Sequence, residues 1–242
     1  MNNLYCENFL VNDTNVDFTS KLSLTEIIKM LQATTFNHSN IIGLDHNTML
    51  NKSNAFWVIT KLKLKLNKNI LTGDKIKVVT WTQPLSTIRA IRDFKIKLKN
   101  SVCVKAVAEW CCLDYNTRKI RKLNSICYPD LNMVENSSNN IEFSKQCVEF
   151  EAKDYIYTKT VRSTDIDINN HTNNLRYNYM AIDAFDLEEL KNLTIKEYEI
   201  HFINETRLND EIEIYKKKIK NNFYIEGRAQ NKIVFKVFIK VK

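Results

Sequence analysis

FWVITKLKLKL, at residues 56–66, alternates apolar and charged side chains along its second half. Successive side chains of a β-strand point to opposite faces, so Leu62, Leu64 and Leu66 share one face and the lysines between them share the other. A sheet with one apolar and one polar face is typical of antiparallel strands, because parallel sheets are covered on both sides. The stretch therefore predicts an antiparallel sheet with a single buried face.

Helical spacing of apolar residues occurs in two long segments. The first, from Leu24 to about Phe36, opens with Ser23 and Glu26, a capping-box pattern that marks a helix N-terminus. The second covers residues 173–190. The further strand candidates are 75–81, 88–99, 102–113, 155–162, 194–203, 211–220, 222–228 and 232–241.

The order of these elements repeats along the chain. Each half runs through a short strand, a helix and four strands, and the turn TGDKIK at 72–77 resembles the turn LNDEIE at 208–213. Such internal similarity indicates a duplication. The residues between the halves are polar and show no sustained period, which indicates a connection. We predict an N-terminal domain at 1–124, a connection at 125–152 and a C-terminal domain at 153–242.

The composition excludes several classes of protein. With 242 residues, of which 44% are hydrophobic, the chain is long enough to form adequate cores. No apolar run approaches the roughly 20 residues of a membrane helix. The N-terminus MNNLYCE lacks the basic start and apolar stretch of a signal peptide, so we expect a cytoplasmic protein without a membrane span. The six cysteines lack metal-ligand spacing, so we expect reduced packing residues and neither a metal nor a cofactor.

The net charge of +8 is unevenly distributed. Residues 1–124 carry 19 Lys and Arg against 9 Asp and Glu, a net +10, whereas residues 125–242 carry 17 against 19, a net −2. A field concentrated on one half favours steering of an acidic partner. We do not expect nucleic-acid binding, because the lysines alternate with core residues along strands and no nucleic-acid motif accompanies them. For any single lysine, a solvated strand face without a partner is the alternative.

The run DINNHTNN, which begins at Asp167, carries the candidate chemistry. Asp167, Asn169 and His171 stand at alternate positions, and in an extended segment they would share a face and point into one cavity. The first backbone amides of the following helix, at Asn173 and Asn174, could hold a developing oxyanion. Carboxylate, imidazole and amide together suit attack of water on an acyl group. The plainer alternative is an Asn-rich helix cap, which has no use for the repeat at every second position.

The first half of the chain lacks this set of residues. Alignment of 11–21 with 161–171 pairs Asp17 with the aspartate of the motif, but it pairs Thr19 with the asparagine and Lys21 with the histidine. We therefore expect only the C-terminal half to be catalytic.

The first half has motifs of its own, and together with the DINNHTNN run they cover nearly the whole chain. They are LQATTFNH at 31–38, IGL at 42–44, Gly73-Asp74, Thr80-Trp81, Arg92-Asp93-Phe94, Trp110 and DYNTRK at 114–119. Together with the motif in the second copy, they resemble the acyl-acyl-carrier-protein (acyl-ACP) thioesterases of bacterial type. This resemblance implies an α+β tandem hotdog fold, in which each antiparallel sheet wraps around a central helix. It also implies hydrolysis of fatty acyl-ACP to free fatty acid, which terminates fatty acid synthesis.

The resemblance further implies a glutamate at a set spacing after the motif histidine, and the residue at that position is Glu205. From the residues alone, Glu205 has a plainer role as a surface ion-pair partner. Many relatives carry a cysteine next to this glutamate, but this chain has Thr206, a weak nucleophile, so direct attack by water is favoured. Asp167 and Glu205 are both candidate bases, and the choice stays open. Asn169 would orient the water, and His171 would position a carboxylate or protonate the leaving thiol.

By the same resemblance, the first half selects the acyl chain, while its net positive charge leads us to expect that it also docks the carrier. Phe56, Trp57 and Val58 are candidate linings of the acyl pocket. The implied partner is an acidic acyl carrier protein that bears acyl-phosphopantetheine, and exposed edge strands make a homodimer possible. The basic residues expected to dock the carrier are Arg118, Lys119, Arg121 and Lys122.

Two other functions stay open at this point. A hotdog thioesterase that accepts acyl-coenzyme A without a carrier protein is the nearer one. A non-catalytic acyl-binding module is the more distant one, because an intact catalytic set in one copy argues against it. Tyr177, on the second predicted helix, is expected to pack in the core rather than to contact the acyl chain.

Overall fold

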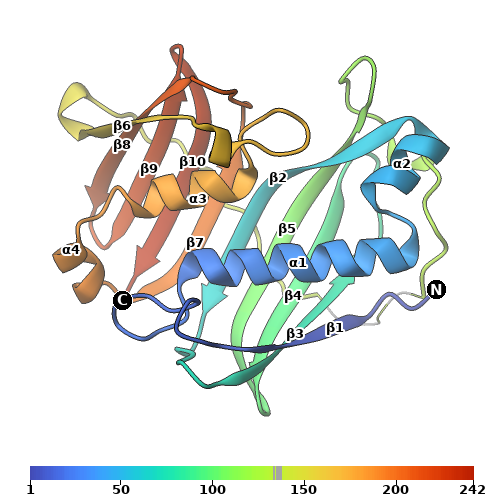
Figure 1. The fold of residues 1–242 in the computed structure, drawn as a ribbon, viewed down its shortest axis with the longest axis horizontal. Helices are drawn as coiled ribbons and strands as arrows, with labels where there is room; N and C mark the ends of the chain where they lie inside the picture. Colours follow the sequence, from blue (N-terminus) through green and yellow to red (C-terminus); the bar gives the residue numbers. More distant parts are fainter. Residues whose placement is uncertain (133, 135–137) are drawn as a thin grey trace. The chain divides into compact units, whose positions relative to one another are not determined.

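The computed structural model describes residues 1–132, 134 and 138–242. The chain forms two compact units, Met1–Ile141 and Glu142–Lys242 (Figure 1). The connection that the sequence predicts at 125–152 contains the division between them. Each unit combines an antiparallel sheet with helices, so the predicted α+β class is confirmed. Within the described ranges, no helix combines the length and the hydropathy that crossing a membrane requires.

The first unit is a sheet packed against helix α1, Leu24–Ile42. Its strands lie in the order β1-β3-β4-β5-β2, and each neighbouring pair is antiparallel. Helix α1 crosses one face of this sheet (Figure 1), and Ile27, Ile28 and Leu31 are among its buried residues. The strand bounds are Tyr5–Leu10 for β1, Ala55–Leu66 for β2, Lys75–Thr82 for β3, Ala90–Leu98 for β4 and Ser101–Asp114 for β5.

Strand β2 contains the alternating stretch that predicts the sheet. Leu62 and Leu64 are buried, as the alternation requires. Lys63, however, is only 7% exposed, although the pattern predicts a solvated side chain there. The register also shifts between Ile59 and Lys61 at a bulge. The alternation therefore identifies the strand correctly but does not establish that its second face is open to water.

Helix α1 begins where the sequence predicts and ends later. The Ser23 side chain caps its N-terminus, as expected. The prediction stops at Phe36, which is 64% exposed, but His38 and Ile42 are buried one helical turn apart and continue the inward face. Gly43 then ends the helix in the left-handed region, with φ of +73°.

A second helix of the first unit, α2, His46–Ser53, is not predicted by the sequence pattern. Asp45 caps it by accepting a hydrogen bond from Thr48 N. Met49 is the buried residue of this helix. With one inward position, a short helix shows no apolar period that a sequence pattern could detect.

The second unit repeats the plan of the first, with strands in the order β7-β10-β9-β8-β6. The single helix predicted at 173–190 is wrong, because the segment forms α3, Asn174–Ile182, and α4, Leu187–Asn192. Asp186 opens α4 through a capping box with Glu189, which competes with continuation of the first helix. The strand bounds are Tyr155–Thr160 for β6, Ile195–Phe202 for β7, Glu211–Ile219 for β8, Asn222–Ala229 for β9 and Lys232–Val241 for β10.

In each unit, a loop precedes the first helix, and the two loops share a backbone hydrogen bond. The bond joins positions that correspond in the alignment of 11–21 with 161–171. Asp17 N donates to Lys21 O at 2.8 Å, and Asp167 N donates to His171 O at 2.9 Å. The same backbone frame therefore carries different side chains in the two units, which supports the interpretation as a duplication.

A second repeated hydrogen bond joins the turn before β3 or β8 to the end of the first strand of its unit. Gly73 N donates to Val11 O at 2.8 Å, and Asn209 N donates to Val161 O at 3.0 Å. The turns at 72–77 and 208–213 therefore occupy the same place in the two units. These two correspondences allow residues of the first unit to be compared with their structural counterparts in the second.

Candidate active site

His171 and Glu205 lie side by side in the second unit. His171 Nε2 is 3.3 Å from Glu205 Oε2. The histidine side chain is 11% exposed, whereas the glutamate side chain is 47% exposed. A buried imidazole beside an accessible carboxylate can take a proton from water and deliver one to a leaving group.

Two loops position this pair. His171 lies between the 3-10 turn Ser163–Asp165 and helix α3, and Glu205 lies between β7 and β8. The residues that follow His171 and Glu205 connect the two loops, because Thr172 N donates a hydrogen bond to Thr206 O at 2.8 Å. A backbone hydrogen bond thus brings together two residues that are far apart in the sequence.

The loop before His171 is a tight turn and not the extended segment that the sequence predicts. Asn170 N donates to Asp167 O at 3.1 Å, which closes the turn. Asn170 adopts the left-handed region with φ of +59°, which asparagine tolerates better than most residues. The argument that alternate residues share one face is therefore wrong for this segment.

The Asp167 carboxylate accepts hydrogen bonds from backbone amides of its own loop. Its Oδ1 accepts hydrogen bonds from Asn169 N at 2.8 Å and from His171 N at 3.4 Å, as in an Asx turn. Asn169 is exposed, and its side chain makes no hydrogen bond to the part of the chain that the structure describes. The structure thus brings His171 and Glu205 together, holds Asp167 on loop amides and leaves Asn169 exposed.

Helix α3 begins directly after the loop. Asn173 is its N-cap, with a side chain that accepts a hydrogen bond from Leu175 N at 2.9 Å. The Asn173 amide itself donates to Asp165 O at 2.8 Å. Of the two amides predicted to hold an oxyanion, the Asn173 amide is therefore occupied, and the Asn174 amide is the candidate at the positive end of the helix dipole.

Three buried hydroxyl groups adjoin the pair. Thr172 Oγ1 lies 2.7 Å from Thr206 Oγ1, and Tyr177 OH lies 3.0 Å from the same atom. Burial raises the pKa of the Tyr177 hydroxyl, and the charge of Glu205 adds to this effect. Tyr177 is buried, in agreement with the predicted core packing, but the sequence pattern gives no indication of its hydrogen bonds. The available signal was a threonine directly after each member of the pair.

Metal sites need several suitable side chains in one place. Among the described residues, no group of three or more His, Cys, Asp or Glu has an arrangement that could hold a metal ion.

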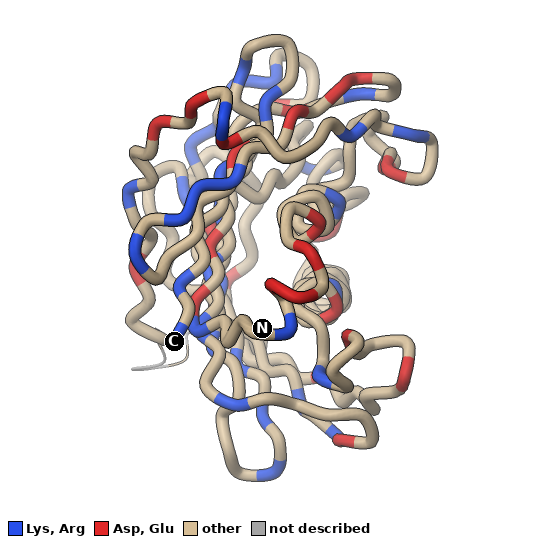
Figure 2. Tube along the Cα trace, turned by 90° about the vertical axis from the view of Figure 1, so that its left-hand side faces the viewer, with Lys and Arg blue, Asp and Glu red and all other residues tan. Residues whose placement is uncertain are grey.

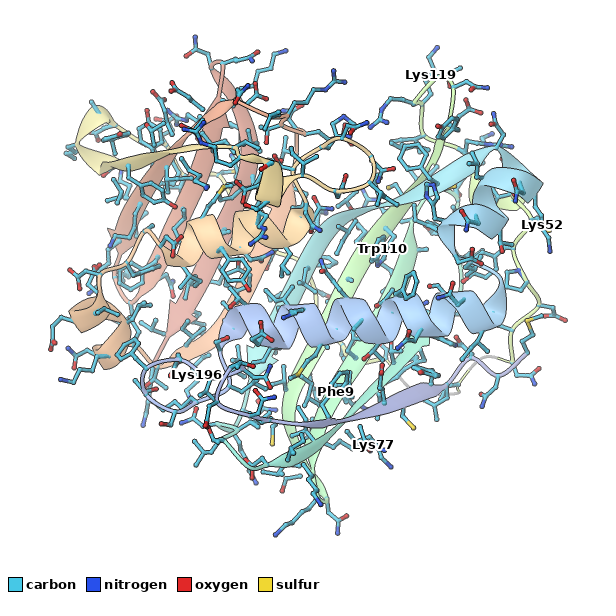
Figure 3. The ribbon with its side chains drawn as sticks, in the orientation of Figure 1. Phe9, Lys52, Lys77, Trp110, Lys119 and Lys196 are labelled. Carbon is cyan, nitrogen blue, oxygen red and sulfur yellow. The ribbon has the colours of Figure 1, made fainter. Side chains whose placement is uncertain are left out.

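Two of the four residues predicted to dock a carrier are held by local structure. The Arg121 guanidinium donates to backbone carbonyls of the first unit, and the Arg118 guanidinium lies 5.2 Å from the centre of the Phe56 ring. Lys119 and Lys122 are exposed, and Figure 3 shows Lys119 on the loop that follows β5. Lys and Arg positions are spread over strands as well as loops (Figure 2).

The three residues predicted to line the acyl pocket do not share one face of β2. Strand alternation puts Phe56 and Val58 on the face opposite to Trp57. Trp57 packs edge to face on Tyr128, with the ring centres 6.5 Å apart, and adjoins the buried core cluster at the end of α1. Trp57 is therefore the one member of the trio that contacts this core.

Two family descriptions match the chain. The N-terminal domain of acyl-ACP thioesterases matches residues 2–128, and the C-terminal domain matches residues 148–241. A chloroplastic acyl-acyl-carrier-protein hydrolase of Cuphea viscosissima is 24% identical over 206 residues, which cover 78% of this chain and 50% of that protein. An oleoyl-acyl carrier protein thioesterase of Arabidopsis thaliana is 23% identical over 212 residues, which cover 79% and 59%. The chain thus spans about half the length of the curated relatives it matches.

Solved structures show the same fold over the whole chain. An acyl-ACP thioesterase from Bacteroides thetaiotaomicron superposes with a TM-score of 0.87 and 22% identity, covering 99% of this chain and 98% of that one. A 12:0-ACP thioesterase from Umbellularia californica gives 0.84 and 15%, covering 100% and 98%. The predicted tandem hotdog fold is therefore confirmed. Since both domains of the family match along most of its length, the chain belongs to the acyl-ACP thioesterase family.

Proposed function

We propose that this protein hydrolyses the thioester of fatty acyl-ACP and releases free fatty acid, which terminates fatty acid synthesis. The observation that carries this proposal is the contact of 3.3 Å between His171, in the DINNHTNN run, and Glu205, in the loop between β7 and β8. Family membership supports the thioester substrate. The pair supplies the acid and base groups that hydrolysis of a thioester needs.

We assign the role of base to Glu205 rather than to Asp167. In the first unit, Asp17 Oδ1 accepts hydrogen bonds from Thr19 N at 2.8 Å and from Lys21 N at 3.3 Å. Asp17 therefore builds the same turn as Asp167 in a loop that lacks the histidine. The turn alone accounts for an aspartate at this position, whereas the Glu205 carboxylate contacts the histidine and is accessible to water.

The reaction then proceeds by direct attack of water. The water oxygen adds to the carbonyl carbon while Glu205 accepts the proton of the water. The negative charge on the carbonyl oxygen is stabilised by the Asn174 amide at the N-terminus of α3. When the carbon–sulfur bond breaks, the proton that Glu205 took from the water passes to the adjoining His171 and from there to the leaving sulfur, which departs as the thiol of the carrier arm. Both side chains thereby return to their starting protonation.

Single-turnover hydrolysis of acyl-ACP by two variants tests the assignment. For Glu205→Gln we expect the rate to fall by about 10²- to 10⁴-fold, because the base is lost. For Asp167→Asn we expect a loss below about tenfold, since the amide oxygen still accepts from the loop amides and forgoes about 1 kcal/mol of charge-assisted bonding.

Asp17→Asn is the matched control, because it makes the same change in the turn of the first unit. We expect this variant to keep the wild-type rate. Unimpaired hydrolysis by Glu205→Gln would contradict the assignment of the base. A loss with Asp167→Asn as large as that with Glu205→Gln would show that Asp167 takes part in the chemistry itself.

The identity of the carrier and the setting of the protein belong to the same proposal. An acidic acyl carrier protein is proposed as the partner, with acyl-coenzyme A as the alternative carrier of the acyl group. A cytoplasmic location and a homodimer stay predictions from the sequence.

A further inference from the structure

Three residues with hydroxyl groups form a buried, hydrogen-bonded cluster in the second unit. They are Thr172, Tyr177 and Thr206, and we call them the hydroxyl cluster. Their exposed fractions are 4%, 2% and 2%. Thr206 Oγ1 lies 2.7 Å from Thr172 Oγ1 and 3.0 Å from Tyr177 OH, and Thr206 N donates to Tyr177 OH at 3.2 Å. Each hydroxyl is therefore paired with another member of the cluster.

The hydroxyl cluster ties together the three segments that hold the site. Thr172 directly follows His171, Thr206 directly follows Glu205, and Tyr177 belongs to helix α3. The residues around Glu205 have no regular secondary structure of their own. The position of the glutamate therefore depends on what its neighbour Thr206 contacts.

The first unit has apolar residues at the same three positions. Leu22 N donates to Ile70 O at 2.8 Å, which is the counterpart of the bond from Thr172 N to Thr206 O. Extension of the same alignment along helices α1 and α3 makes Ile27 the counterpart of the tyrosine. Leu22, Ile27 and Ile70 are 7%, 2% and 3% exposed, so the three positions are buried in both units.

The comparison of the two units shows which of these side chains the fold requires and which are particular to the unit with the candidate site. The backbone frame forms with Leu22, Ile27 and Ile70 in the first unit, so the frame itself does not require hydroxyl groups. Burying three hydroxyls is unfavourable unless each finds a partner, and the aliphatic alternative carries no such cost. The hydroxyl cluster is found in the unit that has the histidine and the glutamate, and it contributes directional bonds that aliphatic side chains lack.

We propose that Thr172, Tyr177 and Thr206 are positioning residues that hold His171 and Glu205 in reacting geometry. This inference rests on the proposed function for its kinetic consequence, while its structural consequence is independent of any substrate. The backbone bond between the two loops sets their approach, and the hydroxyl bonds fix the Glu205 segment against helix α3. Displacement of a reacting group by about 1 Å can slow such a reaction by about a hundredfold.

The experiment combines two variants of the full chain with two measurements. Thr206→Val and Tyr177→Phe each remove one hydroxyl with little change in shape. The first measurement is the NMR signal of the His171 imidazole, and the second is hydrolysis of acyl-ACP as a function of substrate concentration. We expect the imidazole signal to move and kcat to fall at least tenfold, with KM within about twofold of the wild-type value.

Two further variants show whether these effects come from the hydroxyl cluster. Thr206→Ser keeps the hydroxyl and is expected to restore both the signal and kcat. Tyr157→Phe is the matched control, because Tyr157 OH donates to Met180 O at 2.7 Å on the same helix but outside the hydroxyl cluster. It is expected to change neither measurement. Thermal unfolding verifies that each variant folds, and Thr172→Val replaces any variant that does not.

Failure of this inference can be distinguished from failure of the proposed function. If Thr206→Val and Tyr177→Phe leave the His171 signal at its wild-type position, the hydroxyl cluster does not position the pair and the inference is overturned. A moved signal with wild-type kcat overturns it as well. If the wild-type protein hydrolyses no acyl thioester, the proposed function fails, and the His171 signal alone decides whether the hydroxyl cluster holds the pair.

Discussion

Asp17 and Asp167 occupy the same place in the two units. Four residues later, the first unit has Lys21 and the second has His171. Both accept hydrogen bonds from the amides two and four positions later. An aspartate in a catalytic motif is therefore not by itself evidence for a catalytic carboxylate. The duplicated chain supplies its own comparison, because the unit with Lys21 in place of the histidine shows what the turn requires without the reaction.

His38 is a buried histidine whose protonation the folded state opposes. Burial and the Arg92 guanidinium, whose Nη1 is 2.8 Å from His38 Nδ1, lower the pKa of His38 to about 4. An unfolded histidine titrates near pH 6.5, so between these values the unfolded chain binds the proton more readily. The contribution of His38 to stability is therefore complete above about pH 6.5 and is lost as the pH falls toward 4, by about 3 kcal/mol.

Urea unfolding between pH 7 and pH 4 measures this effect. The free energy of unfolding of the wild type should fall with decreasing pH, and that of His38→Gln should fall less steeply, because glutamine does not titrate. His46→Gln is the control, since it also removes one histidine from the first unit. Equal pH dependence in the wild type and in His38→Gln would show that His38 is not the group responsible.

At the scale of the element, strands β9 and β10 meet closely at one pair. Gly227 lies opposite Phe235 in the register, and a Cβ atom at position 227 would lie 2.3 Å from Phe235 Cε1. Phe235 is fully buried, and the Tyr177 ring packs on it with the ring centres 5.3 Å apart. The glycine leaves room for a ring that has little freedom to move.

We expect Gly227→Ala to lower the free energy of unfolding by about 1–3 kcal/mol, because the added methyl group overpacks the core. Denaturant unfolding of Gly227→Ala, Phe235→Leu and the double variant measures the coupling. The double variant should lose less than the sum of the single losses, since leucine vacates the space that the methyl group needs. Additive losses would mean that the two positions do not compete for space.

Local patterns predict the strands well and the irregular segments poorly. The alternation at 56–66 identifies β2 because a strand needs no information from outside itself. The break between α3 and α4 is missed because the cap at Asp186 competes with a continuous helical pattern. The turn at 167–171 is missed because Asn170 takes the left-handed region, which alternation does not reveal.

The candidate site is predicted in part, for a related reason. The motif and the spacing to Glu205 give the pair with His171, but that spacing comes from family resemblance rather than from the residues themselves. The hydroxyl cluster is not predicted, because it depends on a contact between Thr172 and Thr206 that only the fold creates. A pattern read along the chain contains no information about such a contact.

At the scale of the whole molecule, the charge is divided between the two halves of the sequence, with +10 in residues 1–124 and −2 in residues 125–242. Of the four candidate docking residues, Arg121 donates to a backbone carbonyl and Arg118 lies over the Phe56 ring, so charge reversal at the exposed Lys119 and Lys122 is the test that disturbs local contacts least. Long-range attraction between exposed charges is screened beyond about 10 Å at 0.1 M salt. If an acidic carrier docks here, its binding must therefore depend on salt.

Charge reversal at Lys119→Glu and Lys122→Glu together is expected to lower kcat/KM for acyl-ACP about tenfold at low salt, and by less as salt increases, because steering charges act mainly on association. The matched control is Lys220→Glu with Lys232→Glu, which makes the same change in charge at exposed positions of the second unit. Turnover of acyl-coenzyme A should change less than twofold in either double variant. Equal losses in the two double variants would show that Lys119 and Lys122 do not form a local docking surface. Equal losses on both substrates would show that the surface is not specific for the carrier protein and would favour coenzyme A as the carrier of the acyl group.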